Sequence, residues 1–256
     1  MQRTILQREQ KPQRKRRHNM AKKIAVQCGH GTSTDGSWDS GCVYGKYTEA
    51  GLMLKITKAA VKYLRASGIK VISDADTGNN KNMIKDVEWA NKEGVDLYVS
   101  IHCDYSKAPK GVMPLYVSSS GKKLATALNK AIKNGMGMNS RGVQKRTDLW
   151  ELNGTDMTAC ILETGAIKAD LATLRDKPEQ YGKAIAKGIC NYMGVTFKGT
   201  TATQKKTYRV RKTWADSKSQ KGAYTVLANA KKCADRYGYN VYDSSGKEVY
   251  NGGKND

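Results

Sequence analysis

The sequence contains no apolar run approaching the roughly 18 to 20 residues that cross a bilayer, so stable membrane insertion is not expected. Its N-terminus lacks the apolar central region of a secretory signal, which predicts a protein that stays in the cytoplasm until another factor releases it. The six cysteines include no CxxC pair and no tight metal-ligand spacing. We therefore expect them to be small buried side chains in a reducing compartment.

Three common catalytic motifs are also missing. No serine stands in a GxSxG sequence, no GxxxxGK[ST] phosphate loop occurs, and no cysteine has a clear histidine partner. Histidine is rare, with three residues in the chain, and His18 lies in a polar N-terminal stretch. These absences disfavour serine-hydrolase, phosphate-loop and cysteine-protease chemistry.

Positive charge is abundant and unevenly distributed. The formal net charge is +22, of which residues 1–19 contribute +6, residues 20–197 contribute +8 and the last 59 residues contribute +8. The short C-terminal part is therefore much more densely basic than the central part. This density indicates an anionic polymer as its partner, and nucleic acid, teichoic acid and anionic lipid would all meet that condition.

Composition and periodicity divide the chain into four segments. Residues 1–19 are polar, basic and aperiodic, so we expect a disordered extension, with Met20 as the natural start. Residues 20–197 alternate short apolar runs with longer helical ones, which is typical of an α/β domain with a mostly parallel twisted sheet and helices on both faces. Residues 198–207 are predicted to be a polar linker, and residues 208–256 a small α/β domain.

The apolar patterns also predict the individual elements. In the larger domain we expect strands at 23–27, 70–73, 97–102, 111–117, 148–152 and 158–163, and helices at 48–66, 82–92, 122–133 and 178–192. In the smaller domain we expect strands at 208–213, 239–242 and 247–250 and a helix at 227–237. The carboxyl ends of parallel strands border a crevice, which is where ligands bind in such folds.

Four side chains stand where that crevice is expected. His30 follows the first strand in CGHG, His102 ends the run LYVSIHCD, Glu49 opens the following helix, and Glu163 ends the strand TACILETG. Taken singly, each histidine has an equally good structural interpretation, and Glu49 has the simpler one of capping its helix. The position of Glu163 favours a functional role, because a carboxylate that ends a buried strand needs a charge partner or a proton.

Taken together, these residues indicate metal-assisted hydrolysis. Two imidazoles and one carboxylate with an open fourth position are the usual ligands of a catalytic zinc, which acidifies a bound water. A second carboxylate can take a proton from that water and pass it to a leaving nitrogen. A zinc peptidase that cuts within a peptide would use the same chemistry. A basic protein that binds nucleic acid or wall polymer without catalysis is a further alternative, although a pure binder has no need of this set.

Several motifs give the central part of the chain a family resemblance. From about residue 23 to residue 193 the sequence resembles the zinc-dependent N-acetylmuramoyl-L-alanine amidases, the group of bacterial autolysins and phage endolysins. The matching stretches, in chain order, are CGHG at 28–31, Glu49, LRASGIKV at 64–71, WAN at 89–91, DLYVSIHCD at 96–104, GV at 111–112, SRGVQ at 140–144, LWEL at 149–152 and ILETG at 161–165. The chain departs from the family at Gln27-Cys28 and at 85–89, which puts details of substrate contact in doubt but removes no ligand.

The resemblance implies specific roles. It implies one Zn²⁺ per catalytic domain, bound by His30, Glu49 and His102, with Glu163 as the catalytic glutamate. The implied reaction is hydrolysis of the amide bond between N-acetylmuramic acid and L-alanine in peptidoglycan, which lyses Gram-positive cell walls. Arg141 is a candidate for binding a peptide carboxylate through its planar guanidinium, and its alternative is a solvated loop charge.

The C-terminal segment mixes aromatic and basic residues. Such a mixture suits sugar stacking together with polyanion contact, and it also suits single-stranded nucleic acid. The segment resembles the wall-binding domains of endolysins from phages of Gram-positive spore-formers, which implies peptidoglycan and an anionic wall polymer as partners and makes nucleic acid the weaker candidate. The predicted contacts are Tyr208, Arg211, Trp214 and Tyr224, with the alternative that most of these aromatic residues form a small core. The sequence gives no indication of oligomeric state.

Overall fold

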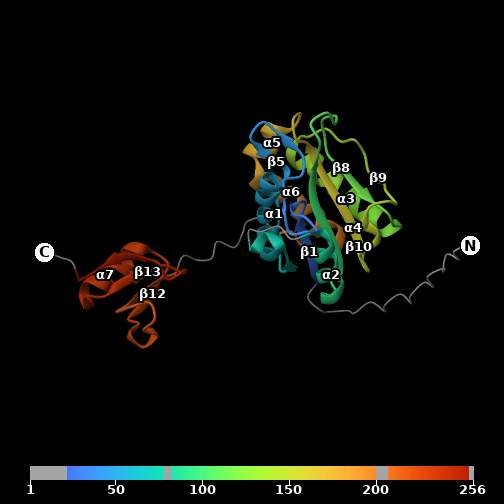
Figure 1. Cartoon of the computed structure of the whole chain (residues 1–256). Coiled ribbons are helices and arrows are strands. Elements are labelled where there is room, and N and C mark those ends of the chain that lie inside the picture. Colours follow the sequence, from blue (N-terminus) through green and yellow to red (C-terminus); the bar gives the residue numbers. More distant parts are fainter. Residues whose placement is uncertain (1–21, 78–81, 200–206, 254–256) are drawn as a thin grey trace, which may run out of the picture.

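The computed structural model describes residues 22–77, 82–199 and 207–253 (Figure 1). The predicted extension at 1–19 lies outside these residues, as does most of the predicted linker at 198–207. Within the described ranges, no helix is long and apolar enough to cross a membrane.

The larger part is built on a six-stranded sheet with the strand order β6-β1-β7-β10-β8-β9. The first four strands in this order run parallel, β8 runs antiparallel to β10, and β9 runs parallel to β8. The bounds are β1 (Lys23–Cys28), β6 (Lys70–Ile72), β7 (Leu97–Asp104), β8 (Met113–Tyr116), β9 (Gln144–Lys145) and β10 (Thr158–Ala166). The predicted α/β fold with a mostly parallel sheet is therefore confirmed.

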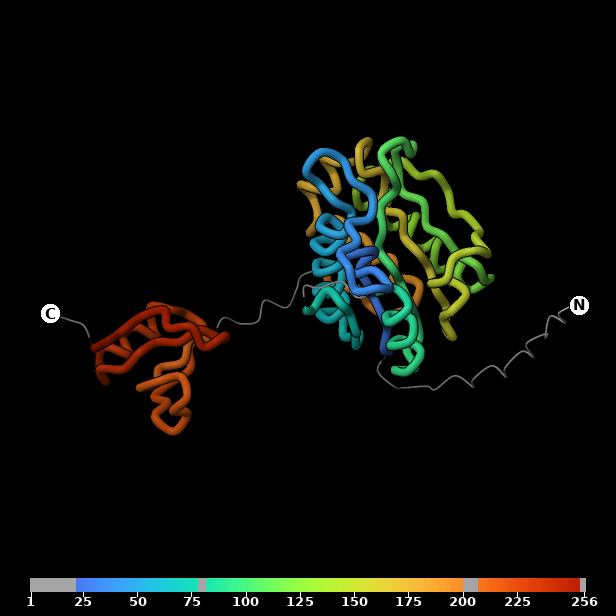
Figure 2. Tube along the Cα trace, in the orientation of Figure 1, coloured from blue at the N-terminus to red at the C-terminus, as the bar shows by residue number. Residues whose placement is uncertain are grey.

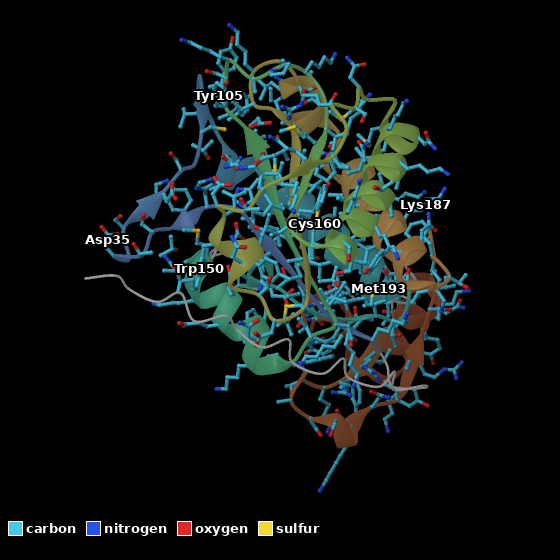
Figure 3. The ribbon with its side chains drawn as sticks, turned by 90° about the vertical axis from the view of Figure 1, so that its right-hand side faces the viewer. Asp35, Tyr105, Trp150, Cys160, Lys187 and Met193 are labelled. Carbon is cyan, nitrogen blue, oxygen red and sulfur yellow. The ribbon has the colours of Figure 1, made fainter. Side chains whose placement is uncertain are left out.

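Helices cover both faces of this sheet. On one face lie α1 (Glu49–Ala66), α3 (Ser119–Met136) and α6 (Pro178–Met193), with α6 packed against both of the others, and the short α5 (Leu171–Asp176) precedes α6. On the other face lie α2 (Met83–Glu93) and α4 (Trp150–Asn153). Figure 3 shows Trp150 and Lys187 on opposite sides of the strand that carries Cys160. Alternate residues of the strands fill the two cores, since Val99 packs in the larger one and Tyr98 in the smaller one.

Two helix starts show how the sequence sets these elements. The Thr48 side chain accepts a hydrogen bond from the Gly51 backbone at 3.2 Å and caps α1. The Asn82 side chain accepts one from Ile84 at 2.9 Å and caps α2. The predicted helices at 48–66 and 82–92 therefore lie within one residue of the observed ones.

The predicted strand at 148–152 is wrong, because this segment forms the single helical turn α4. Leu149 and Leu152 are three residues apart, and both pack against the smaller core, which is helical rather than strand spacing. Asn153 Nδ2 closes the turn by donating to the Leu149 carbonyl at 2.9 Å. Two short hairpins were not predicted: β2 (Gly31–Thr32) pairs with β3 (Trp38–Asp39), and β4 (Val43–Tyr44) pairs with β5 (Tyr47–Thr48).

The C-terminal part, coloured orange to red in Figure 2, has a separate sheet. Its antiparallel order is β12-β11-β13-β14, and α7 packs on it around the buried residues Val210, Ala230, Ala234 and Val241. The bounds are β11 (Tyr208–Arg211), β12 (Gly222–Tyr224), α7 (Leu227–Tyr237), β13 (Asn240–Tyr242) and β14 (Glu248–Asn251). The strand β12 was not predicted, and the proposed domain boundaries stay predictions.

Candidate metal centre

The three predicted metal ligands lie together at the carboxyl ends of β1 and β7. His30 follows β1, His102 lies near the end of β7, and Glu49 is the first residue of α1. His30 Nε2 lies 3.4 Å from Glu49 Oε2, and His102 Nδ1 lies 3.1 Å from Glu49 Oε1. One ligand atom from each side chain lies within 4.8 Å of the other two. The three side chains therefore converge on one point.

This spacing fits a zinc ion. A tetrahedral zinc with ligand distances of about 2.0–2.1 Å separates its ligand atoms by about 3.3 Å. His30 Nε2 lies 3.4 Å from Glu49 Oε2 and His102 Nδ1 lies 3.1 Å from Glu49 Oε1, so each imidazole is close to that spacing from one oxygen of the same carboxylate. The set of two imidazole nitrogens and one carboxylate is also the donor set that leaves a fourth position for water or substrate.

Glu49 is buried, and its carboxylate is fixed by backbone groups. Oε1 accepts a hydrogen bond from the Cys103 N–H at 2.9 Å, and Oε2 accepts one from the Cys42 N–H at 3.1 Å. Burial raises its pKa, but hydrogen bonding and charge from His102 and the charge of His30 outweigh burial and lower the pKa to about 2. Since Thr48 caps α1, the Glu49 carboxylate is free to face the site.

His30 is oriented by a second carboxylate. Its backbone has a φ of 63°, the left-handed region that residues with side chains rarely adopt. Its Nδ1 lies 2.8 Å from Asp39 Oδ2, and the other Asp39 oxygen accepts a hydrogen bond from the Gly41 N–H at 2.9 Å. Asp39 therefore holds the imidazole so that Nε2 faces Glu49, as carboxylates behind zinc-binding histidines commonly do.

His102 has an equivalent partner on its far side. Its Nε2 lies 2.9 Å from Ser100 Oγ and 3.2 Å from Glu151 Oε2, and the other Glu151 oxygen accepts a hydrogen bond from the Tyr98 hydroxyl at 2.8 Å. Burial lowers the pKa of His102, but Glu151 and Glu49 outweigh burial and hold it well above its usual value. Both imidazoles are thus held between Glu49 and a further carboxylate.

Two glycines leave the space that this arrangement needs. A Cβ atom on Gly29 would lie 2.4 Å from His102 Nδ1, so the first glycine of CGHG lets β1 approach the second histidine. A Cβ atom on Gly41 would lie 2.6 Å from Glu49 Oε2, and Gly41 also has a φ of +63°. A side chain at either position would displace a ligand.

Neither Asp39 nor Glu151 was identified from the sequence. Glu151 did carry a signal, since it is an acid beside the apolar residues Leu149, Trp150 and Leu152. Asp39 lies in the hairpin region 31–48, where no periodicity marks it.

Glu163 is positioned beside the three ligands with a free carboxyl oxygen. It pairs in register with His102 across β10 and β7, so the two side chains leave the sheet on the same face. Among the described residues, Glu163 Oε2 has no hydrogen-bond partner. Burial is the largest influence on its pKa, and together with the charges of Asp104 and Glu49 it raises the pKa to about 7, against the lowering effects of His102 and Arg141.

Arg141 lies near this carboxyl group but is engaged elsewhere. Its guanidinium forms an ion pair with Asp104, and its Nε donates to the Gly111 carbonyl at 2.9 Å. The side chain is largely buried, so it is not the solvated loop charge that was the alternative interpretation. Its role in substrate binding stays a prediction.

All six cysteines are free thiols, and two of them lie against Glu49. Cys42 Sγ is 3.8 Å from Cys103 Sγ, and this pair has metal-ligand spacing with Glu49. Hydrogen bonding to Cys42 and burial raise the pKa of the Cys103 thiol far above its usual value. Because the thiolate is the metal-binding form, the two histidines are the better ligands.

A cleft of about 190 Å³ borders the two imidazoles, and neither Glu49 nor Glu163 is among its lining residues. Its lining includes His30, Asp39, His102 and Glu151. The N-cap residue Asn82 and the first residue of α2, Met83, form part of its wall. A substrate group entering here meets both imidazoles.

The predicted wall-binding residues fall into two pairs. Arg211 lies over the Trp214 ring, with 5.0 Å between the guanidinium carbon and the ring centroid, and Trp214 is 38% exposed. Tyr208 and Tyr224 face each other across β11 and β12 and pack, partly buried, against the small core. In the first pair the Trp214 ring is partly exposed, while the half-buried Arg211 guanidinium donates hydrogen bonds to Gln220 Oε1 and to the Trp214 carbonyl. The second pair contributes to packing.

Comparisons with known proteins identify relatives of the larger part of the chain. The solved structure of the N-acetylmuramoyl-L-alanine amidase AmiC2 of Nostoc punctiforme is 25% identical, covers 68% of this chain and 97% of that chain, and has a TM-score of 0.61. The catalytic domain of the CD27L endolysin targeting Clostridia difficile shares the fold, with 22% identity, coverage of 66% and 97% respectively, and a TM-score of 0.56.

A curated relative, an uncharacterized 38.4 kDa protein of Clostridium perfringens, is 33% identical over 179 residues, which is 66% of this chain and 51% of that protein. The chain thus spans about half the length of the curated relatives it matches. The sequence model of a family described as N-acetylmuramoyl-L-alanine amidase matches residues 24–191, which run from β1 to α6 and include all four predicted catalytic-site residues. The chain therefore belongs to the N-acetylmuramoyl-L-alanine amidase family.

Proposed function

We propose that this protein is a zinc-dependent amidase that hydrolyses the bond between N-acetylmuramic acid and L-alanine in peptidoglycan and so lyses Gram-positive cell walls. The observation that carries the proposal is the convergence of His30, Glu49 and His102, with the free carboxyl of Glu163 beside them. Family membership supports the choice of bond.

His30 Nε2, His102 Nδ1 and the Glu49 carboxylate would hold the zinc. Bound there, the ion would polarise the scissile carbonyl and acidify a water molecule. Asp39 and Glu151 keep the two imidazoles oriented, and the burial of Glu49 excludes water from the carboxylate that faces them. The chain thus supplies a preorganised site rather than one that must reorganise during reaction.

Glu163 is the general base and then the general acid. Its Oε2 takes a proton from the attacking water and delivers it to the amide nitrogen as the bond to alanine breaks. A pKa of about 7 suits both steps, because at neutral pH the carboxylate can accept a proton and the carboxylic acid can release it.

Digestion of purified walls tests the bond that is cut. Free alanine amino groups on peptides detached from the glycan are the expected products. New reducing sugar ends, or cuts confined to the peptides, would reject the amidase. The second of these outcomes would instead support the zinc peptidase considered from the sequence.

Two substitutions separate metal binding from proton transfer. Glu163→Ala should retain zinc and lose lysis, because Glu163 is not a ligand. His30→Ala should lose both, because it removes one of three ligands. Zinc content by elemental analysis and turbidity loss of wall suspensions measure the two effects, and normal lysis by Glu163→Ala would show that the base is another residue.

We also propose that residues 208–256 bind the cell wall. The exposed Trp214 ring with the Arg211 guanidinium stacked on it supports this role, because such a pair offers both a stacking face and a cation to a charged glycan. Lysines lie over further rings of this part, such as Lys231 at 4.7 Å from the Tyr250 centroid. A phage endolysin and a host autolysin would both be compatible with this combination of an amidase and a basic domain.

A further inference from the structure

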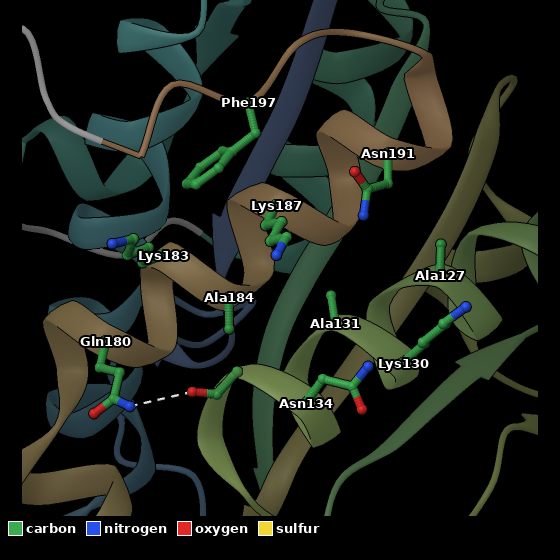
Figure 4. A pocket seen from close by; sticks show the side chains of 11 residues that line it. Ala127, Lys130, Ala131, Asn134, Gln180, Lys183, Ala184, Lys187, Asn191 and Phe197 are labelled. Atoms are coloured by element: carbon green, nitrogen blue, oxygen red, sulfur yellow. Dashed lines mark hydrogen bonds between the residues drawn. The ribbon is translucent and has the colours of Figure 1, made fainter.

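A groove among the described residues is lined by none of the metal ligands. It runs between α3 and α6, has a volume of about 610 Å³, and shares no lining residue with the catalytic cleft (Figure 4). Its floor is formed by small side chains such as Ala131 and Ala184. None of the described residues that line it is acidic.

Three lysines form the walls of this helix groove. Lys130 comes from α3, and Lys183 and Lys187 come from α6, one helical turn apart. All three are exposed, and none forms an ion pair with a described residue. The only acid in the two helices, Glu179, instead pairs with Lys62 of α1 at 2.7 Å. The groove is therefore a strip of uncompensated positive charge.

The small residues explain why a groove exists here. A Cβ atom on Gly188 would lie 3.1 Å from Ala131 Cβ, and one on Gly135 would lie 3.1 Å from Ala184 Cβ. The helices therefore pack closely at their line of contact, and the aliphatic parts of the long lysine side chains form the rims above it. At one end, Gln180 Nε2 donates to the Gly135 carbonyl at 3.1 Å and joins the two helices (Figure 4).

We propose that this helix groove binds a polyol phosphate chain, that is, a phosphodiester-linked polymer of the cell wall. Its cations are spread along the groove rather than gathered at one point, which suits a repeating anion better than a single one. They are lysines, whose ammonium groups bind phosphate oxygens as point charges. Asn134 and Asn191 on the rims offer amide groups to polyol hydroxyls.

This proposal rests on the proposed function in one respect: an enzyme that acts on peptidoglycan meets such a polymer in the cell wall. Binding there would hold the catalytic domain itself on the wall, independently of the basic C-terminal residues. Hydrolysis of the amide does not require it, because the groove contributes no residue to the metal centre.

Lysine footprinting of the full chain with soluble poly(glycerol phosphate) tests the site directly. In the presence of the polymer, Lys130, Lys183 and Lys187 should be protected from acetylation, while Lys122 of the same α3 helix and Lys92 of α2 should stay reactive. Equal protection of both groups would overturn the proposal in favour of diffuse charge attraction. Stronger protection of the groove lysines by single-stranded DNA of equal charge would also overturn it, since the groove would then be a nucleic-acid site.

Two triple variants give the matched affinity test. Lys130→Gln with Lys183→Gln and Lys187→Gln should weaken polymer binding about tenfold and should lower the slope of log affinity against log salt by up to about 2, since about 0.7 is lost per phosphate contact. The control, Lys92→Gln with Lys122→Gln and Lys133→Gln, removes the same charge from exposed positions off the groove and should change neither. Identical losses in both variants would refute the groove.

A third measurement separates this proposal from the proposed function. On peptidoglycan stripped of phosphate polymers, the groove variant should release peptides as fast as the parent protein. A parent protein that releases none would refute the amidase and leave the polymer measurements unaffected. A groove variant that is slow on stripped peptidoglycan would refute the separation of the groove from catalysis.

Discussion

Glu163 should destabilise the fold when it is ionised, and Glu163→Gln should remove that effect. The carboxyl is desolvated, and its Oε2 has no hydrogen-bond partner among the described residues. Glutamine has nearly the same shape as the protonated acid and cannot ionise. The substitution therefore tests the environment of the proposed base without reference to catalysis.

The sign and size of the effect follow from the two pKa values. The carboxyl pKa is about 7 in the fold, compared with an ordinary value of 4.5. Below pH 4.5 both the folded and the unfolded chain carry the proton, and Glu163 has no effect on the pH dependence of stability. Between 4.5 and 7 the folded chain binds more protons than the unfolded one, so stability falls as pH rises. Above pH 7 the loss is complete and reaches up to about 3 kcal/mol, at about 1.4 kcal/mol for each pKa unit.

Urea unfolding of the chelator-treated protein measures this loss. The free energy of unfolding of Glu163→Gln relative to the parent should increase steadily from pH 5 to pH 8, by about 2 to 3 kcal/mol. Glu88→Gln on the exposed side of α2 controls for the removal of one carboxylate. A stability difference that stays constant over this range would refute the view that burial raises the Glu163 pKa, and with it the argument that Glu163 is poised to exchange a proton near neutral pH.

Three further substitutions test the supports around the centre and the C-terminal domain. Glu151→Gln should weaken zinc binding roughly 10- to 100-fold in chelator competition, because it removes the carboxylate behind His102, and an unchanged affinity would show that Ser100 suffices. Gly41→Ala should lower zinc content and wall lysis together, since its Cβ would lie 2.6 Å from a Glu49 oxygen; retention of both would mean that the loop moves freely. Trp214→Ala should reduce cosedimentation with purified walls several-fold while hydrolysis of soluble fragments stays normal, and unaltered cosedimentation would place the wall contacts elsewhere.

The fold was largely predictable because its signals are local or periodic. The helix at 48–66 has a capping threonine, apolar residues at helical spacing and a following glycine, so its bounds followed from sequence alone. The strand predicted at 148–152 was wrong because apolar residues over five positions fit both a strand and one helical turn. Only the packing of Leu149 and Leu152 against the core decides between the two. The hairpins at 31–48 could not be predicted because their strands are two residues long, which is too short to show an alternation of apolar and polar residues.

The site was predictable only where topology places residues together. His30, His102 and Glu163 end neighbouring strands, and Glu49 starts the helix after the first one, so a parallel sheet brings all four to one edge. Asp39, by contrast, reaches His30 from a loop whose course the sequence did not indicate. The residues that orient the ligands depend on side-chain directions in loops and short turns, and strand order gives no information about these.

The charges of the centre explain why its residues favour a divalent cation. Glu49, Glu151 and Asp39 surround two imidazoles, and Glu163 lies beside them, so the site contains more carboxylates than a single positive charge can balance. The high pKa of His102 reflects this excess, because a proton on the ring partly neutralises Glu151 and Glu49. A zinc ion bound at His102 Nδ1 would have to displace a proton from that nitrogen, so metal affinity should fall as pH falls. The same carboxylates that orient the imidazoles would thus attract the proposed cation and would make its binding dependent on pH.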